Sequence, residues 1–246
     1  MIITARRNPA MSRRDFHHHL RHVHWPLIQS LPRVEQALGG YVQNHALGPD
    51  SPVEAEPAIP VATDRDSVIE LFFDNEAALG HLAAIPEYLA QVRPDEAYFN
   101  DLPHNMMVQT APEIVFTAAR TGRCKRFDFL ARAAGVDAQD FVERIRACGR
   151  DLALDPLYTG QIDRLVHNIV GAKGGAGFGA GSFDCVVESW ASTFTSLSGV
   201  AARHYAIEGV DKLQSFTVYA TEFVMIEPAS PQAKRSVEHP TSIDAL

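Results

Sequence analysis

Two kinds of hydrophobic pattern alternate along the chain, and they occur in the same order twice. Short apolar runs rich in β-branched and aromatic residues predict strands, and apolar residues three to four positions apart predict helices. In the first half these patterns predict strands at residues 2–7, 40–45, 67–72 and 105–110, and helices at 12–31 and 75–92. In the second half they predict strands at 114–120, 164–168, 185–190 and 215–226, and helices after Asp137 and at 193–207. Each half therefore has the predicted order β-α-β-β-α-β.

Local signals support the helix at the beginning of each half. Ser12 is a good N-cap with Asp15 three residues later, and Pro26 is expected to kink or end the segment that follows. In the second half Asp137 is the expected cap, with an apolar stripe that is formed by Phe141, Ile145 and Leu152.

The two halves also resemble each other in sequence. Residues 2–7 read IITARR and residues 114–120 read IVFTAAR, while residues 67–72 match residues 185–190 at an offset of 118. Self-similarity of this kind indicates a repeat. The order β-α-β-β-α-β is the ferredoxin-like arrangement, in which helices cover one face of an antiparallel sheet. The other face must also be covered, and two halves can cover each other.

We therefore expect an α+β fold in which two ferredoxin-like repeats pack sheet-on-sheet as an intramolecular dimeric α/β barrel. The first repeat is placed at residues 1–111 and the second at 112–228, with only Ala111 and Pro112 between the adjoining strands. Residues 229–246 are polar and contain proline, so we expect a disordered tail there.

Composition excludes several classes of partner. The 246 residues include 22 Lys and Arg against 30 Asp and Glu, a formal charge of −8, which disfavours nucleic acid and anionic membranes as partners. No apolar run is long enough for a membrane-spanning helix. The three cysteines form no CxxC motif, which favours a reducing, cytoplasmic location. A homodimer of the fused barrel is compatible with these data.

A glycine-rich segment at residues 171–181 has the sequence GAKGGAGFGAG. Its single lysine, Lys173, precedes the glycine run, and the order GxxxxGK[ST] of phosphate-binding loops is absent. We expect a flexible hairpin loop, or a mobile lid, and no phosphate site.

A series of residues in the first half resembles the EthD family of dimeric α/β-barrel proteins. The series consists of Arg7, Met11, Ser12, Phe16, His24, Trp25, Pro26, Leu27, Tyr41 to His45, Glu70 to Asp74, Asp95, Glu96, Phe99 and Asp101. The second half resembles a degenerate repeat of the same type, which keeps Asn168 and Glu188 but has no histidine near residues 149–154. If this chain uses the chemistry of the family, the site should therefore lie in the first half.

The resemblance implies a small apolar pocket between sheet and helices, with histidines or acids that transfer protons. Related dimeric α/β-barrel proteins include polyketide cyclases, isomerases, cofactor-independent monooxygenases, decarboxylases and haem-handling enzymes. A fold does not fix function, so the residues themselves must carry the argument.

His24 is the candidate general acid and base. Five of the eleven histidines lie between Phe16 and Trp25, and most are expected on a solvated helix surface. His18 and His22 are four residues apart but lack a third ligand in register, so we predict no metal site. His24 precedes Trp25 and Pro26 at the end of the expected helix, where an imidazole can give and take a proton at neutral pH. A purely structural role for His24 is the alternative.

Four further residues are candidates for substrate binding. Tyr41 and Asn44 are expected to position polar atoms of a substrate, with Asn44 facing inward beside Val42. Glu70 lies among apolar strand residues, where burial would raise the pKa of its carboxyl group. Asp95 belongs to the acidic positions of the family. The alternatives are that Asn44 satisfies a strand edge, that Glu70 is structural and that Asp95 is an exposed turn or cap residue.

The sequence therefore predicts an enzyme without a cofactor that acts by histidine-mediated proton transfer. The expected substrate is small and hydrophobic, of aromatic, polyketide-like or lactone-like type, and the reaction is a cyclisation, isomerisation, dehydration or decarboxylation. The alternatives are a monooxygenase or haem-handling barrel, and a non-catalytic binding or accessory protein.

Overall fold

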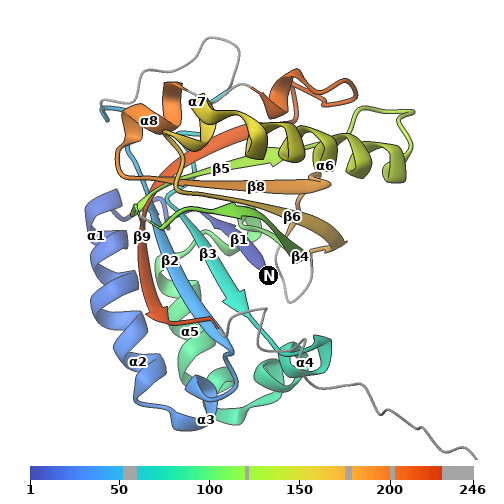
Figure 1. Ribbon diagram of the computed structural model, residues 1–246. Helices are drawn as coiled ribbons and strands as arrows, with labels where there is room; N and C mark the ends of the chain where they lie inside the picture. The colour runs from blue at the N-terminus through green and yellow to red at the C-terminus, as the bar shows by residue number, and fades with distance from the viewer. Residues whose placement is uncertain (52–59, 120–121, 175–178, 200–202, 229–246) are drawn as a thin grey trace, which may run out of the picture.

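Eight strands form one closed antiparallel barrel (Figure 1). The computed structural model describes residues 1–51, 60–119, 122–174, 179–199 and 203–228. The strands are β1 (Ile2–Ala5), β2 (Gly40–Ala46), β3 (Ser67–Phe72), β4 (Met106–Thr117), β5 (Cys124–Leu130), β6 (Arg164–Lys173), β7 (Gly179–Ala180), β8 (Cys185–Ala191) and β9 (Phe216–Ile226). Their order is β1-β3-β2-β9-β5-β8-β6-β4, and β4 returns to β1, while the short β7 adds in parallel to β4.

Helices cover the outside of the barrel in two layers (Figure 1). The first layer contains α1 (Arg13–His19), a π-turn (Leu20–His24), α2 (Trp25–Gln29), α3 (Pro32–Glu35), α4 (Glu76–Ala84), a second π-turn (Tyr88–Val92), α5 (Arg93–Phe99) and a 3₁₀ turn (Leu102–His104). The second contains α6 (Ala138–Leu154), α7 (Pro156–Thr159), α8 (Phe194–Gly199) and a 3₁₀ turn (His204–Ala206). In the described ranges, no helix is both long and apolar enough to cross a membrane.

The expected caps are confirmed. The side chain of Ser12 accepts a hydrogen bond from the backbone of Asp15, and that of Asp137 accepts from Gln139 and Asp140. Pro26 does not end the helical path, because it lies in the first turn of α2, where its missing N–H is not needed.

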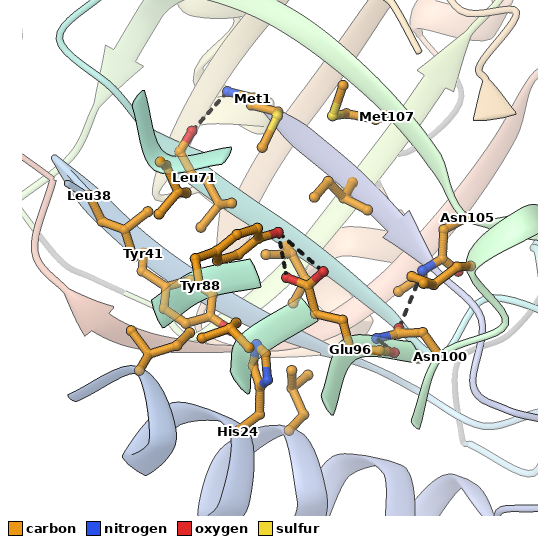
Figure 2. A pocket seen from close by; sticks show the side chains of 18 of the residues that line it. Met1, His24, Leu38, Tyr41, Leu71, Tyr88, Glu96, Asn100, Asn105 and Met107 are labelled. Atoms are coloured by element: carbon orange, nitrogen blue, oxygen red, sulfur yellow. Dashed lines mark hydrogen bonds between the residues drawn. The ribbon is translucent and has the colours of Figure 1, made fainter. Parts of the chain in front are cut away.

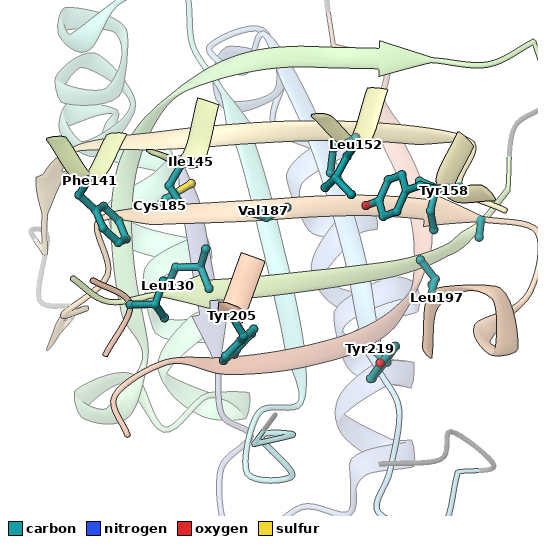
Figure 3. Close-up of a cluster of buried hydrophobic side chains, with 14 residues drawn as sticks. Leu130, Phe141, Ile145, Leu152, Tyr158, Cys185, Val187, Leu197, Tyr205 and Tyr219 are labelled. Carbon is teal, nitrogen blue, oxygen red and sulfur yellow. The ribbon is translucent and has the colours of Figure 1, made fainter. Parts of the chain in front are cut away.

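Strand alternation separates the interior into three hydrophobic clusters. Inside the barrel, residues such as Phe127, Phe129 and Val186 pack together. Phe16 and Phe99 belong to the cluster between the first half of the sheet and α1 to α5. The third cluster, between β5, β6, β8 and β9 and the helices α6 to α8, is drawn in Figure 3. It contains the predicted stripe Phe141, Ile145 and Leu152, and all three of these side chains are buried.

The strand order differs from the prediction at the centre of the chain. The sequence predicted that the strand at 114–120 opens the second half. Residues 114–117 instead continue β4, and the second half opens with β5. Ala111 and Pro112, expected between two strands, lie inside β4. The reason is closure: β4 pairs with β1 near its beginning and with β6 from Val108 to Thr117.

The two halves are joined by hydrogen-bonded strand pairs, and not only by the expected packing of two sheets. Their sheets meet edge to edge, through β2–β9 and β4–β6, and become one barrel. Closure pairs the backbone groups that two open sheets would leave at their edges. The expected tail at residues 229–246, and residues 175–178 of the expected glycine-rich loop, lie outside the described residues.

Candidate functional site

A cavity of about 110 Å³ lies between the outer face of β1, β2 and β3 and the helices α1 to α5 (Figure 2). Its wall is mainly apolar, with aliphatic and aromatic side chains from both layers. They include Leu20, Ile28, Val34, Leu38, Ile69, Leu71, Leu82, Val92, Phe99 and Met107. A few polar side chains interrupt this wall, and these determine what the cavity can do chemically.

His24 reaches the cavity from the end of the π-turn. In this π-turn the backbone N–H of Trp25 donates a hydrogen bond to the carbonyl oxygen of Leu20, five residues earlier, and the chain continues directly into α2. The His24 side chain is therefore directed inward, where it is 5% exposed and lines the cavity. The prediction placed this ring where the chain leaves helical geometry. The structure shows instead a local widening within a continuous helical path.

Asp95 holds the His24 ring. Nδ1 of His24 lies 2.7 Å from Oδ2 of Asp95, and Nε2 of His19 lies 2.8 Å from the other carboxylate oxygen. Burial opposes ionisation of Asp95, but the hydrogen bonds from the two histidines outweigh it and lower the pKa of this carboxyl group. A carboxylate only accepts hydrogen bonds. Nδ1 of His24 is therefore the donor to Asp95, and in the neutral ring the lone pair lies on Nε2, where it can act as a base.

Two tyrosines bring hydroxyl groups to the same cavity. The Tyr88 hydroxyl donates to Glu96, at 3.1 and 3.2 Å from its two oxygens, and Glu96 also accepts from Arg93. The Tyr41 hydroxyl oxygen accepts from Nε2 of Gln43 at 3.0 Å. Burial is the largest cause that raises the pKa of both tyrosines, so both stay protonated. Because Tyr41 accepts from Gln43, its own O–H remains available for another acceptor.

Of the predicted site residues, the structure brings His24, Tyr41 and Asp95 together. It does not bring Asn44 or Glu70 to this cavity. Along β2, Tyr41 faces the helices and Asn44 faces the barrel interior, because successive side chains of a strand point to opposite faces. Glu70 on β3 likewise faces the interior, between Ile69 and Leu71, which line the cavity. Asn44 and Glu70 therefore cannot contact a substrate in this cavity, and the residue that orients the His24 ring is Asp95.

Asn44 and Glu70 belong instead to a charged cluster inside the barrel. Asn44 donates to Glu70 at 2.8 Å, and Nζ of Lys125 lies 2.5 Å from the same carboxylate. Lys125 also lies 2.6 Å from Glu188 and 3.4 Å from Glu222. Burial and the neighbouring Glu70 raise the pKa of Glu188 to about 8. The attraction of Lys125 lowers the pKa of Glu70 despite its burial.

Sequence reasoning missed Lys125, Tyr88 and Glu96 as residues of these two sites. Lys125 carried a signal, because it is one of four lysines and begins the alternation Lys-Arg-Phe-Asp-Phe at the start of a strand. Glu96 was part of the family resemblance, but nothing in the sequence paired it with Tyr88. Among the described residues, no three His, Cys, Asp or Glu side chains are placed to hold a metal ion. His18 and His22 lie side by side on the exposed surface.

Comparison with known proteins supports the family resemblance. Residues 8–103 match the EthD domain. A relative from Gibberella zeae, the dehydratase aurZ, is 26% identical over 110 residues, which cover 44% of this chain and 72% of that protein.

Solved structures of low sequence identity share the fold. The structure of an anthrone oxidase-like protein superposes with a TM-score of 0.55 at 10% identity and covers 94% of both chains. A protein from Fusobacterium nucleatum, provisionally assigned as a monooxygenase, gives a TM-score of 0.54 at 7% identity and covers 93% of this chain and 94% of that one. At these identities the likeness establishes architecture alone. The chain therefore shares its architecture with these structures, and residues 8–103 are similar to the EthD domain.

Proposed function

We propose that the cavity beside His24 is the active site of a cofactor-independent enzyme that removes water from a hydrophobic, aromatic or polyketide-like substrate. The observation that carries this proposal is the hydrogen bond of 2.7 Å between His24 and Asp95 at the wall of an apolar cavity. A carboxylate that holds one nitrogen of an imidazole turns the other nitrogen into an oriented base. The similarity to the dehydratase aurZ favours water loss over the other reactions predicted from the sequence.

In the proposed reaction His24 moves one proton. Its Nε2 accepts a proton from the carbon next to a substrate carbonyl group, and the electrons of that C–H bond form a C=C bond. The C–O bond to a hydroxyl group on the next carbon breaks, and the imidazolium returns its proton to the departing oxygen, so that water leaves. Asp95 stabilises the imidazolium while it exists, because it is already ionised and in hydrogen-bond contact.

Tyr41 is proposed to bind the carbonyl oxygen of the substrate. Its oxygen accepts from Gln43, and its O–H remains available to donate to the substrate oxygen on which negative charge develops as the C–H bond breaks. Tyr88 is held by Glu96 and has a positioning role at the opposite wall. The low polarity of the surrounding wall strengthens the hydrogen bond of Tyr41 to the substrate and that of Tyr88 to Glu96.

The matching strand orders, β2-β3-β1-β4 and β6-β8-β5-β9, support the interpretation that the two halves are repeats, although the predicted boundary between residues 111 and 112 lies inside β4. We propose that the first repeat carries the chemistry and the second completes the barrel. The apolar wall of the cavity supports a small hydrophobic substrate. A homodimer of the fused barrel and a cytoplasmic location stay predictions of the sequence.

The test uses 3-hydroxy-1-tetralone, which loses water to give fluorescent 1-naphthol. The wild-type protein should accelerate this reaction. His24→Ala should lower kcat by about 10²–10⁴-fold, the usual contribution of a general acid or base. His18→Ala is the matched control, because His18 lies on the same helical segment but is exposed, and it should keep the wild-type rate. Equal rates for all three proteins would refute the assignment.

The same preparation distinguishes the alternative functions. Oxygen consumption with an aromatic ketone, in the absence of 1-naphthol formation, would favour the monooxygenase. A Soret band that forms when haem is added would favour the haem-handling barrel. Binding of 1-naphthol without any turnover would favour a non-catalytic protein.

A further inference from the structure

A second hollow adjoins the cavity and opens to the surface. This outer groove has a volume of about 510 Å³ and lies between the beginning of α4 and the seam of β4 and β6. Met1 and Leu79 line both the cavity and the outer groove. In Figure 2, Met1 lies at the end of the cavity opposite His24. The outer groove therefore borders the cavity at the end away from the proposed base.

The side chains that line the outer groove are uncharged. Apolar side chains such as Phe73 and Ile169 alternate with the amide and hydroxyl groups of Asn75, Gln109 and Thr110. No Asp, Glu, Lys, Arg or His belongs to this lining. The α-ammonium group of Met1 donates to the carbonyl oxygen of Leu71, and burial lowers its pKa. The side chains of the outer groove therefore favour an uncharged group that is partly apolar and carries neutral oxygen atoms, and none of them offers a counter-charge to a phosphate or carboxylate.

The backbone of β6 is shaped to keep the outer groove open. Gln109 on β4 pairs with Ala172 and Thr110 pairs with Val170, so that Gly171 is an extra residue without a partner on β4. Such bulges occur preferentially beside functional sites, and a strand glycine often marks the close approach of a ligand. A Cβ atom on Gly171 would meet only the carbonyl oxygen of Gln109, at 3.9 Å. The backbone would therefore accept a side chain here, but that side chain would occupy the outer groove.

We propose that the outer groove binds the extended, uncharged part of an elongated aromatic substrate whose reacting end occupies the cavity. The cavity of about 110 Å³ is small beside the ~300–1,000 Å³ of sites that hold drug-sized ligands, and the outer groove supplies the missing space. The proposal requires the substrate to pass between Met1 and Leu79, the two residues that line both hollows. The position of the reacting end rests on the proposed function, but binding in the outer groove can be tested without turnover.

The experiment compares two probes, 2-naphthol and 6-hexyl-2-naphthol, by isothermal titration calorimetry. In the wild-type protein each methylene that enters the outer groove should tighten binding about fourfold. Gly171→Trp should abolish the gain from the hexyl group and leave the Kd of 2-naphthol within about twofold. Gly80→Trp is the matched control, because Gly80 lies on exposed α4 with open space around its position and lines neither hollow. It should bind both probes as the wild type does.

Ala111→Trp provides a second way to fill the outer groove, because Ala111 is exposed on β4 and lines the groove. It should reproduce the effect of Gly171→Trp if the latter variant fails to fold. The proposal is overturned if 2-naphthol does not bind, if the hexyl group brings no gain in the wild type, or if both filled variants weaken both probes equally.

His24→Ala separates this proposal from the proposed function. That variant should keep the gain in affinity from the hexyl group, which depends on the outer groove, while it loses turnover of 3-hydroxy-1-tetralone. A hexyl gain that Gly171→Trp abolishes, together with no turnover in any protein, would refute the dehydratase and confirm the outer groove.

Discussion

Replacement of Lys125 by methionine should cost about 3–5 kcal/mol of unfolding free energy at pH 7.5. Lys125 is completely buried, and its ammonium group lies within 2.6 Å of carboxylate oxygens of both Glu70 and Glu188. Methionine has a similar length and is apolar, so the cost of an empty cavity is small. What remains is the cost of a buried carboxylate whose counter-charge has been removed.

The structure indicates why the cost corresponds to about one charge. Glu188, with its pKa raised to about 8, is largely protonated at pH 7.5. Glu222 is 18% exposed and accepts a hydrogen bond from Trp190 at 2.9 Å, so it keeps other partners. Glu70 alone is left as a buried anion, with Asn44 and the protonated Glu188 as its remaining donors. A loss of this size would be a large part of the ~5–15 kcal/mol that stabilises a typical domain.

Urea denaturation, followed by tryptophan fluorescence, measures this loss at pH 7.5 and at pH 5. Without Lys125 the pKa of Glu70 rises above its unfolded value, because burial is no longer opposed. A carboxyl group with a raised folded-state pKa destabilises the protein progressively as the pH rises from its unfolded-state pKa to its folded-state pKa. The deficit of the variant relative to the wild type should therefore shrink at pH 5.

A double variant provides the control. Lys125→Met with Glu70→Gln removes both the cation and the stranded anion, and should recover most of the lost free energy. A loss below about 1 kcal/mol for Lys125→Met, or the same deficit at both pH values, would refute the view that Lys125 neutralises the barrel interior.

Four smaller perturbations test other parts of the structure. Glu188→Gln should flatten the pH dependence of the unfolding free energy. In the wild type the raised pKa of about 8 stabilises the protein at low pH, and about 2 kcal/mol of this is lost as the pH rises from 6 to 8. The same slope of unfolding free energy against pH in both proteins would contradict the assignment. Asp95→Asn should lower kcat on 3-hydroxy-1-tetralone by at least about 10²-fold with little change in KM, whereas a change in KM alone would indicate a binding role. Ser12→Ala should cost about 1 kcal/mol in urea denaturation, and no loss would show that the cap contributes nothing. Gly149→Ala should cost about 1–3 kcal/mol in the same assay, because its Cβ would lie 2.4 Å from a ring carbon of His167, and an unchanged midpoint would show that this ring can move away.

Most of the fold was predictable from the sequence, because hydrophobic period and capping residues are local signals. Ser67–Phe72 is both the predicted and the observed β3, and Ser12 and Asp137 cap the helices as expected. The break between the halves was misplaced because IVFTAAR looks like IITARR in sequence, while only the closure of the barrel shows that β4 continues to Thr117. That information lies in long-range pairing with β6, and no local pattern contains it.

The candidate site was predictable in part for a similar reason. The ring of His24 could be placed at the end of a helical segment, and Asp95 could be named as a candidate. However, the hydrogen bond between them joins residues 71 positions apart, which only the packing of α5 against the π-turn brings together. The pairing of Tyr88 with Glu96 and the outer groove were likewise invisible, because they depend on the relative positions of packed elements.

Strand alternation also explains why one run of residues serves two separate sites. On β3, Ile69 and Leu71 form the wall of the cavity, and Glu70 between them binds Lys125 of β5 inside the barrel. A slip of one residue in β3 would turn Ile69 and Leu71 toward the charged cluster around Lys125 and would turn Glu70 toward the apolar cavity. The Glu70–Lys125 contact therefore fixes the register that presents the cavity wall, and it does so from the second half of the chain. For this reason a substitution at Glu70 or Lys125 should alter the cavity wall beside His24, although Asn44 and Glu70 do not line the cavity.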